Sequence, residues 1–188
     1  MLDVALKRFT VKIRITIKSA VSLLCVVLAV GLPQIAHVVG GASAGATWLP
    51  MYLPVLLAGC LLGSVWGLGV GILSPLISFG FTTLALGNAM PALGRLPFMV
   101  AELAVFGLVT GLFSKKIENN SLFAFPAVII AQLAGRTVNL IAGLIAGQSI
   151  TALWNVIQTG LIGLYLQALI VPVVVIILAK VIKNDNAR

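Results

Sequence analysis

Long stretches without charge constrain the fold of this chain more than any other feature. No Asp, Glu, Lys or Arg stands between Lys18 and Arg95. Apolar segments cover approximately residues 20–39, 49–62, 65–86, 96–113, 122–145 and 156–182. An α-helix needs about 20 apolar residues to cross the roughly 30 Å of hydrocarbon in a bilayer. Only 9% of the 188 residues are charged, against about 25% in soluble domains, so the sequence excludes a water-soluble fold and predicts an all-α integral membrane protein.

The basic residues predict how often the chain crosses the bilayer. The segment 53–86 is too long for one span at about 1.5 Å per residue and slightly short for two full spans. Two spans there give a bundle of six transmembrane helices with both termini cytoplasmic, and this arrangement places nearly all Lys and Arg on the cytoplasmic side, as membrane proteins prefer. The residues placed there are Lys7, Arg8, Lys12, Arg14, Lys18, Lys115, Lys116, Lys180, Lys183 and Arg188.

We expect a single membrane domain, with a basic cytoplasmic segment at 1–19, the six-helix bundle at 20–183 and a cytoplasmic tail at 184–188. The amino terminus also resembles a signal peptide, with Ala-Ser-Ala at 42–44 in the place of a cleavage site. Its apolar stretch exceeds the usual length of about 7–15 residues, so we expect a retained first span. Topology also explains the net charge of +8, because the basic residues lie at the ends of apolar runs and not on a nucleic-acid-binding face.

Polar side chains inside the apolar segments are the candidates for function, because hydrocarbon tolerates ionisable groups only where they are paired or face water. Glu102 follows Arg95 by seven residues, so a helix places both on nearly one face, with Arg95 at the outer rim. The next segment carries Gln132, Arg136 and Asn139 on one stripe, which must face protein or water. The candidate substrate-binding residues of an outward-opening cavity are Arg95, Glu102, Gln132, Arg136, Asn139, Asn155, Gln158 and Tyr165.

Two interpretations of these residues stay open. In the first, the fork of Arg136 holds an anionic group of a ligand while amides and Tyr165 hold neutral polar groups. In the second, Glu102 and Arg136 form a buried ion pair that only keeps the bundle in register.

The sequence offers little for catalysis or metal binding. His37 is the single histidine and is expected to be a solvated residue at a helix end, while Cys25 and Cys60 have no metal-ligand spacing. No Gly-x-x-x-x-Gly-Lys-Ser/Thr phosphate loop occurs. We therefore expect no enzyme, no cofactor and no metal, and any active transport needs energy from a partner.

Glycines recur at four-residue spacing at Gly59, Gly63, Gly67 and Gly71. On one continuous helix they would form a smooth ridge that lets another backbone approach closely. Packing within the bundle is the favoured interpretation, and docking of another protein is the alternative.

Two segments carry a family resemblance: Leu-Pro-Met-Tyr-Leu-Pro-Val-Leu-Leu-Ala-Gly at 49–59 and Arg-Leu-Pro-Phe-Met-Val-Ala-Glu-Leu at 95–103. With the small size and six-span layout, they resemble the substrate-binding S components of energy-coupling factor (ECF) vitamin transporters, over essentially the whole chain. Related sequences often have His where this chain has Tyr52. The family's Ala-x-x-x-Ala docking pattern on the first span is matched only by Cys25-x-x-x-Ala29.

The resemblance implies a vitamin-binding subunit in a bacterial cell (inner) membrane, joined to a transmembrane coupling protein and two cytoplasmic ATPase subunits. It places ligand contacts on spans four to six, with the loop 40–48 as a cover. The candidate docking residues are Cys25 and Ala29, the nearest match to the family's pattern, together with Gly59, Gly63 and Gly67 of the glycine ridge. Pantothenate is the first substrate candidate, because Arg suits its carboxylate and amides suit its hydroxyl and amide groups; cobalamin or another water-soluble vitamin follows.

Two other classes compete with this reading. A small homo-oligomeric channel or scaffold would use the glycine ridge for self-association. An intramembrane enzyme would use Glu102 as a base, but the sequence supplies no convincing nucleophile or cofactor motif for it.

Overall fold

The computed structural model describes residues 10–41, 44–85, 87 and 90–186, with side chains to residue 181. All regular structure in this part of the chain is helical. The helices are α2 (Val11–Gly40), α3 (Ala44–Trp48), α4 (Tyr52–Leu62), α5 (Ser64–Ala85), α6 (Leu96–Leu112), α7 (Ser114–Asn119), the 3-10 turn η1 (Ser121–Phe123), α8 (Ala124–Ile145) and α9 (Ile150–Asn186). Lys7, Arg8, Arg188 and most of the cleavage-like motif lie outside the described residues, as do the side chain of Lys183 and part of the expected cover at 40–48.

Five helical segments are long and apolar enough to cross a membrane: Val11–Gly40, Ala44–Leu62, Ser64–Ala85, Ser121–Ile145 and Ile150–Val181. These are the helices of a multi-pass membrane protein. The remaining expected span corresponds to α6, an apolar helix of 17 residues, at the lower limit of about 17–25 residues for a spanning helix.

The expected division of 53–86 into two helices is confirmed, and Gly63 marks the reversal between α4 and α5. Gly63 has φ +96°, a backbone conformation that residues with a Cβ rarely adopt. Its N–H donates to the carbonyl of Gly59 at 3.0 Å, and α5 then folds back onto α4. A Cβ added to Gly67 would lie 2.7 Å from the Cα of Gly59, so the glycines face each other across a tight hairpin.

Helix α6 packs into this hairpin and against α8, and glycine makes the approach possible. A Cβ on Gly107 would lie 2.0 Å from the carbonyl oxygen of Gly67, and a Cβ on Gly71 would lie 2.3 Å from that of Leu103. Both distances are far below van der Waals contact, so the backbones touch where side chains would otherwise keep them apart. The glycines therefore join α4, α5 and α6 within one molecule.

The structure places the expected docking residues inside the chain's own helix packing. The face of Gly59 is filled by α6 and that of Gly67 by α6 and α4, while Gly63 forms the turn. Cys25 is 7% exposed and Ala29 is fully buried, because α2 packs against α4 and α5. These side chains contact the chain's own helices, so the ridge is an internal seam and the packing interpretation is the one that the structure supports.

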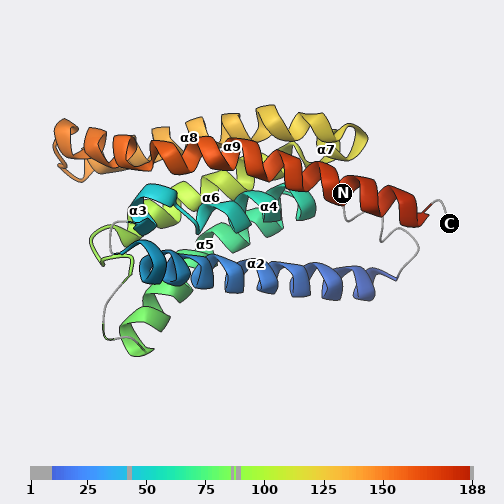
Figure 1. Ribbon diagram of the computed structural model, residues 1–188, viewed down its shortest axis with the longest axis horizontal. Helices are drawn as coiled ribbons and strands as arrows, with labels where there is room; N and C mark the ends of the chain where they lie inside the picture. Colours follow the sequence, from blue (N-terminus) through green and yellow to red (C-terminus); the bar gives the residue numbers. More distant parts are fainter. Residues whose placement is uncertain (1–9, 42–43, 86, 88–89, 187–188) are drawn as a thin grey trace.

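The basic helix ends gather at one end of the bundle. Figure 1 shows the start of α2, the whole of α7 and the end of α9 at one end, with α3 and the turn between α8 and α9 at the other. Lys12, Arg14 and Lys18 lie in the first part of α2, and Lys115 and Lys116 lie in α7. Outward faces of α2, α5, α8 and α9 expose large apolar side chains such as Leu23, Leu73, Leu133 and Leu169, as lipid contact requires.

Candidate binding cavity

A cavity of about 460 Å³ lies among the helix ends around α3, at the end of the bundle away from α7 (Figure 1). Its wall combines the last turns of α2, α3, the start of α4, the segment before α6, and parts of α6, α8 and α9. The volume falls within the range of about 300–1,000 Å³ typical of small-molecule sites. Apolar side chains, among them Phe98, Met99 and Leu153, cover much of this wall.

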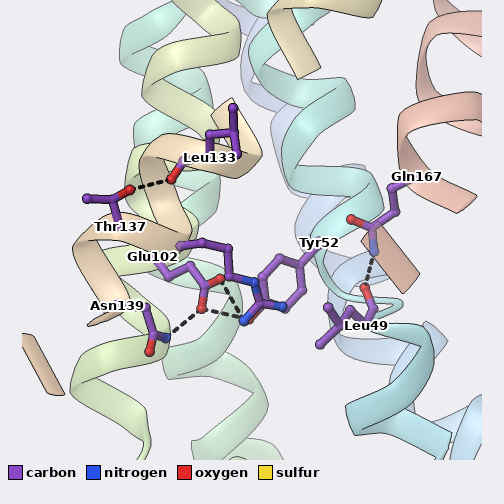
Figure 2. A network of polar contacts seen from close by, with 8 residues as sticks. Leu49, Tyr52, Glu102, Leu133, Thr137, Asn139 and Gln167 are labelled. Atoms are coloured by element: carbon purple, nitrogen blue, oxygen red, sulfur yellow. Dashed lines mark hydrogen bonds and ion pairs between the residues drawn. The ribbon is translucent and has the colours of Figure 1, made fainter. Parts of the chain in front are cut away.

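Glu102 is the centre of a polar network on the cavity wall. Its side chain is 1% exposed, and one carboxylate oxygen, Oε2, accepts from the Tyr52 hydroxyl at 3.1 Å and from the Asn139 amide at 2.7 Å. The other oxygen, Oε1, lies 3.2 Å from Nη1 of Arg136. Figure 2 shows how Tyr52 and Asn139 approach the carboxylate from α4 and α8. The three elements thus meet at one buried carboxylate.

Close packing of α6 and α8 brings the two charges together. Gly135 precedes Arg136, and a Cβ at Gly135 would lie 2.1 Å from the ring of Phe106 and 3.1 Å from the carbonyl oxygen of Glu102. The Phe106 ring also packs edge-on against Tyr52, with ring centroids 5.2 Å apart. The missing side chain therefore lets α8 approach α6 closely enough for a short ion pair.

Arg136 is buried without a full set of hydrogen-bond partners. It is 8% exposed, and its Nε and Nη2 atoms have no hydrogen-bond partner in the protein. A guanidinium presents its donors in a fixed planar fork that matches a carboxylate. Here Glu102 contacts Nη1 alone, so the donors at Nε and Nη2 are buried without a hydrogen-bond partner in the protein. A Cβ on Gly160 would lie 2.7 Å from Nη2, so this glycine provides the space that the guanidinium occupies.

The structure brings together five of the eight predicted site residues on the cavity wall: Arg95, Glu102, Arg136, Asn139 and Asn155. Arg95 is exposed and Glu102 is buried, so the predicted order of rim and depth agrees with the structure.

The other three lie elsewhere. The Gln132 amide donates to the carbonyl of Leu164 on α9 at 3.0 Å. Gln158 is exposed and lies outside the cavity wall. Tyr165 is 70% exposed and is likewise absent from that wall. Gln158 and Tyr165 therefore do not contribute to this wall, because α9 turns both side chains outward.

Sequence reasoning missed part of the wall. Gln34 and Ser78 line the cavity, although each is a polar residue in an apolar span and so gave the same signal as Gln132. His37 also lines it and is half-buried against α3, with its Nδ1 3.3 Å from the carbonyl oxygen of Gly41. This corrects the expected solvated position, since the short helix α3 folds back over the end of α2.

Met90, which precedes α6, is fixed to α5 beside the cavity. The Ser78 and Thr82 hydroxyls donate to the carbonyl of Met90 at 3.0 and 3.1 Å, and the N–H of Met90 donates to Thr82 Oγ1 at 2.8 Å. These bonds hold Met90 and Pro91 against the cavity. Sequence periodicity does not predict this position, because both residues follow a long apolar span.

No metal-binding cluster of three or more His, Cys, Asp or Glu occurs among the described residues. Comparison of the chain with protein-family models, curated proteins and solved structures gave no significant match in any of the three searches. The fold and site therefore define the class directly: a multi-pass helical membrane protein with a partly polar cavity near one end of its bundle.

Proposed function

We propose that this chain is the substrate-binding membrane subunit of an ECF-type, ATP-driven vitamin uptake transporter, with pantothenate as the first candidate substrate. The observation that carries the proposal is Arg136, a buried arginine on the wall of a 460 Å³ cavity with donors that no protein group fills. A buried donor without a partner destabilises the protein by about 1–3 kcal/mol. Such an arginine is typical of a site completed by an anionic ligand.

Charge and size favour a small anion. The charged side chains on the described part of the wall are Arg95, Glu102 and Arg136. Their formal charges sum to +1. A monoanion with neutral polar groups matches this balance. The cavity volume of about 460 Å³ suits pantothenate better than the much larger cobalamin, so the structure supports the first candidate over the second.

The remaining parts of the proposal concern orientation, location and partners. With the basic ends of α2, α7 and α9 in the cytoplasm, the cavity opens toward the outside, both termini are cytoplasmic and α6, the fourth in chain order, completes the six spans. This orientation suits uptake across a bacterial cell membrane. A transmembrane coupling protein and two ATPase subunits supply the energy. Against an enzyme, one oxygen of Glu102 accepts two hydrogen bonds and the other is paired with the Arg136 cation, an arrangement that favours the ionised carboxylate as a structural partner.

Binding measurements on purified protein with a vitamin panel test the proposal. We expect pantothenate to bind, and Arg136→Gln to weaken binding by about 10- to 100-fold, from roughly 1.5–3 kcal/mol for hydrogen bonds to a charged group. Arg136→Lys keeps the charge and loses the fork, so it should also bind weakly. Thr137→Val is the matched control, because Thr137 is exposed and its hydroxyl bonds only the Leu133 carbonyl of its own helix (Figure 2).

Folding of each variant is checked by size-exclusion chromatography and thermal unfolding. Gentle extraction should also copurify an integral coupling protein with ATPases. Folded wild-type protein that binds no vitamin of the panel would refute the proposed function.

A further inference from the structure

A second open donor lines the same cavity, on the helix that the predicted site did not include. Pro33, Gln34 and His37 form the part of the wall contributed by α2. The amide nitrogen of Gln34 is buried and has no hydrogen-bond partner in the protein. It therefore bears the same unmet bonding capacity as Arg136, on a different helix.

Gln34 differs from the polar side chains nearby whose buried donors have partners. The amides of Asn139 and Gln132 donate to Glu102 and to the Leu164 carbonyl. On the wall itself, the Ser78 hydroxyl donates to the Met90 carbonyl and the Thr159 hydroxyl donates to the Asn155 carbonyl. Among the described cavity residues, Arg136 and Gln34 are the side chains that keep buried donor atoms without partners.

The two open groups differ in the chemistry that they recognise. The guanidinium of Arg136 favours an anionic group, whereas a carboxamide N–H is a neutral donor suited to a carbonyl or hydroxyl oxygen. Apolar side chains, including Phe98 and Met99, line the same cavity. The wall is thus polar on α8 and α2 and largely apolar elsewhere.

We propose that Gln34 is a second anchor of this site, which donates to a neutral oxygen of the ligand whose carboxylate is held by Arg136. This inference rests on the proposed function and narrows its substrate class to monoanions that carry a neutral carbonyl or hydroxyl group apart from the carboxylate. In pantothenate the amide carbonyl and the hydroxyl groups have this chemistry. A plain alkanoate, which lacks such an oxygen, gains nothing from Gln34.

A comparison of pantothenate with panthenol separates the two anchors, because panthenol keeps the amide and hydroxyl groups and has an alcohol in place of the carboxylate. We expect Gln34→Leu to weaken both ligands by the same factor, about 3- to 10-fold, the value of one neutral hydrogen bond of roughly 0.5–1.5 kcal/mol. Arg136→Lys should weaken pantothenate more than panthenol. The control Thr16→Val, on an exposed part of α2, should change neither affinity.

Thermal unfolding of ligand-free protein gives a second readout that needs no ligand. Leucine removes the unpaired buried amide, so Gln34→Leu should raise the Tm of the empty protein, the trade of stability against function expected at a binding residue. Equal pantothenate affinity in wild type and Gln34→Leu, or a lower Tm of the empty variant, would overturn the role of Gln34. Failure of the wild-type protein to bind either ligand would instead count against the proposed function. The Tm comparison would still decide whether the buried Gln34 amide lacks a partner in the empty protein, as the anchor role requires.

Discussion

A double-substitution experiment on Glu102 and Arg136 distinguishes an ion pair that only stabilises the bundle from one that also serves a ligand. Their nearest charged atoms lie 3.2 Å apart and both side chains are buried. Glu102→Gln leaves the Arg136 cation without its ion-pair partner. Removing one partner of a buried pair typically costs about 3–5 kcal/mol, and we expect this loss for Glu102→Gln.

Arg136→Met should cost less, because Glu102 keeps its hydrogen bonds from Tyr52 and Asn139. The combined variant Glu102→Gln/Arg136→Met leaves no buried charge, and replacement of a whole pair is often close to neutral. We therefore expect the double variant to lose at most about 2 kcal/mol, which is less than Glu102→Gln alone. A double variant whose loss of stability equals the sum of the two single-variant losses would refute this account of the network.

Unfolding in mixed micelles with increasing sodium dodecyl sulfate, followed by the fluorescence of the three tryptophans, measures these free energies. Pantothenate binding is then measured on each folded variant. A purely structural pair predicts that the double variant regains both stability and binding. A ligand-binding arginine predicts that stability returns and binding does not, and this is the outcome that we expect.

Two further substitutions test the packing and the network. Gly67→Ala should destabilise the protein by about 1–3 kcal/mol, the usual cost of overpacking, because its Cβ would lie 2.4 Å from a backbone carbonyl oxygen of α6. Gly69→Ala is the control, because a Cβ there would have nothing within 4 Å. This variant should be neutral or stabilising in the same detergent titration. Tyr52→Phe removes one hydrogen bond to the buried carboxylate and should lower stability by about 1–3 kcal/mol with the ring packing intact; an unchanged midpoint would contradict a role for the hydroxyl.

Hydrophobic length and charge predicted the helical class and most helix positions, because the bilayer imposes both on the sequence directly. Breaks inside apolar segments were harder to predict. The segment 49–62 was expected as one span, and the structure extends this span to Ala44–Leu62, built from α3, a turn and α4. Leu49, in the turn, has φ +48°, and the Gln167 amide of α9 donates to its carbonyl at 2.8 Å. Such a tertiary contact joins residues far apart in the chain and leaves no local pattern.

The candidate site was partly predictable for a similar reason. The cost of burying charge identified Glu102 and Arg136 without any knowledge of their partners. Helical periodicity then placed Asn139 beside them, but it did not decide which face of α9 turns inward, and so Gln158 and Tyr165 were included. Gln34 carried the same polar signal on the first span, but no charged residue within 20–39 pointed to it.

Under the proposed function, the geometry of Arg136 has to meet two opposing requirements of an anion site in a bilayer. An arginine without a counterion is too costly to hold in the empty protein, whereas an arginine with all its donors filled has nothing left for a ligand. Glu102 contacts a single nitrogen of the guanidinium and leaves Nε and Nη2 without partners. Its second oxygen is already occupied by Tyr52 and Asn139, and these bonds restrain the carboxylate from rotating to bind both nitrogens. The network thus holds both buried charges and leaves Nε and Nη2 without partners in the protein, as the proposed anion site requires.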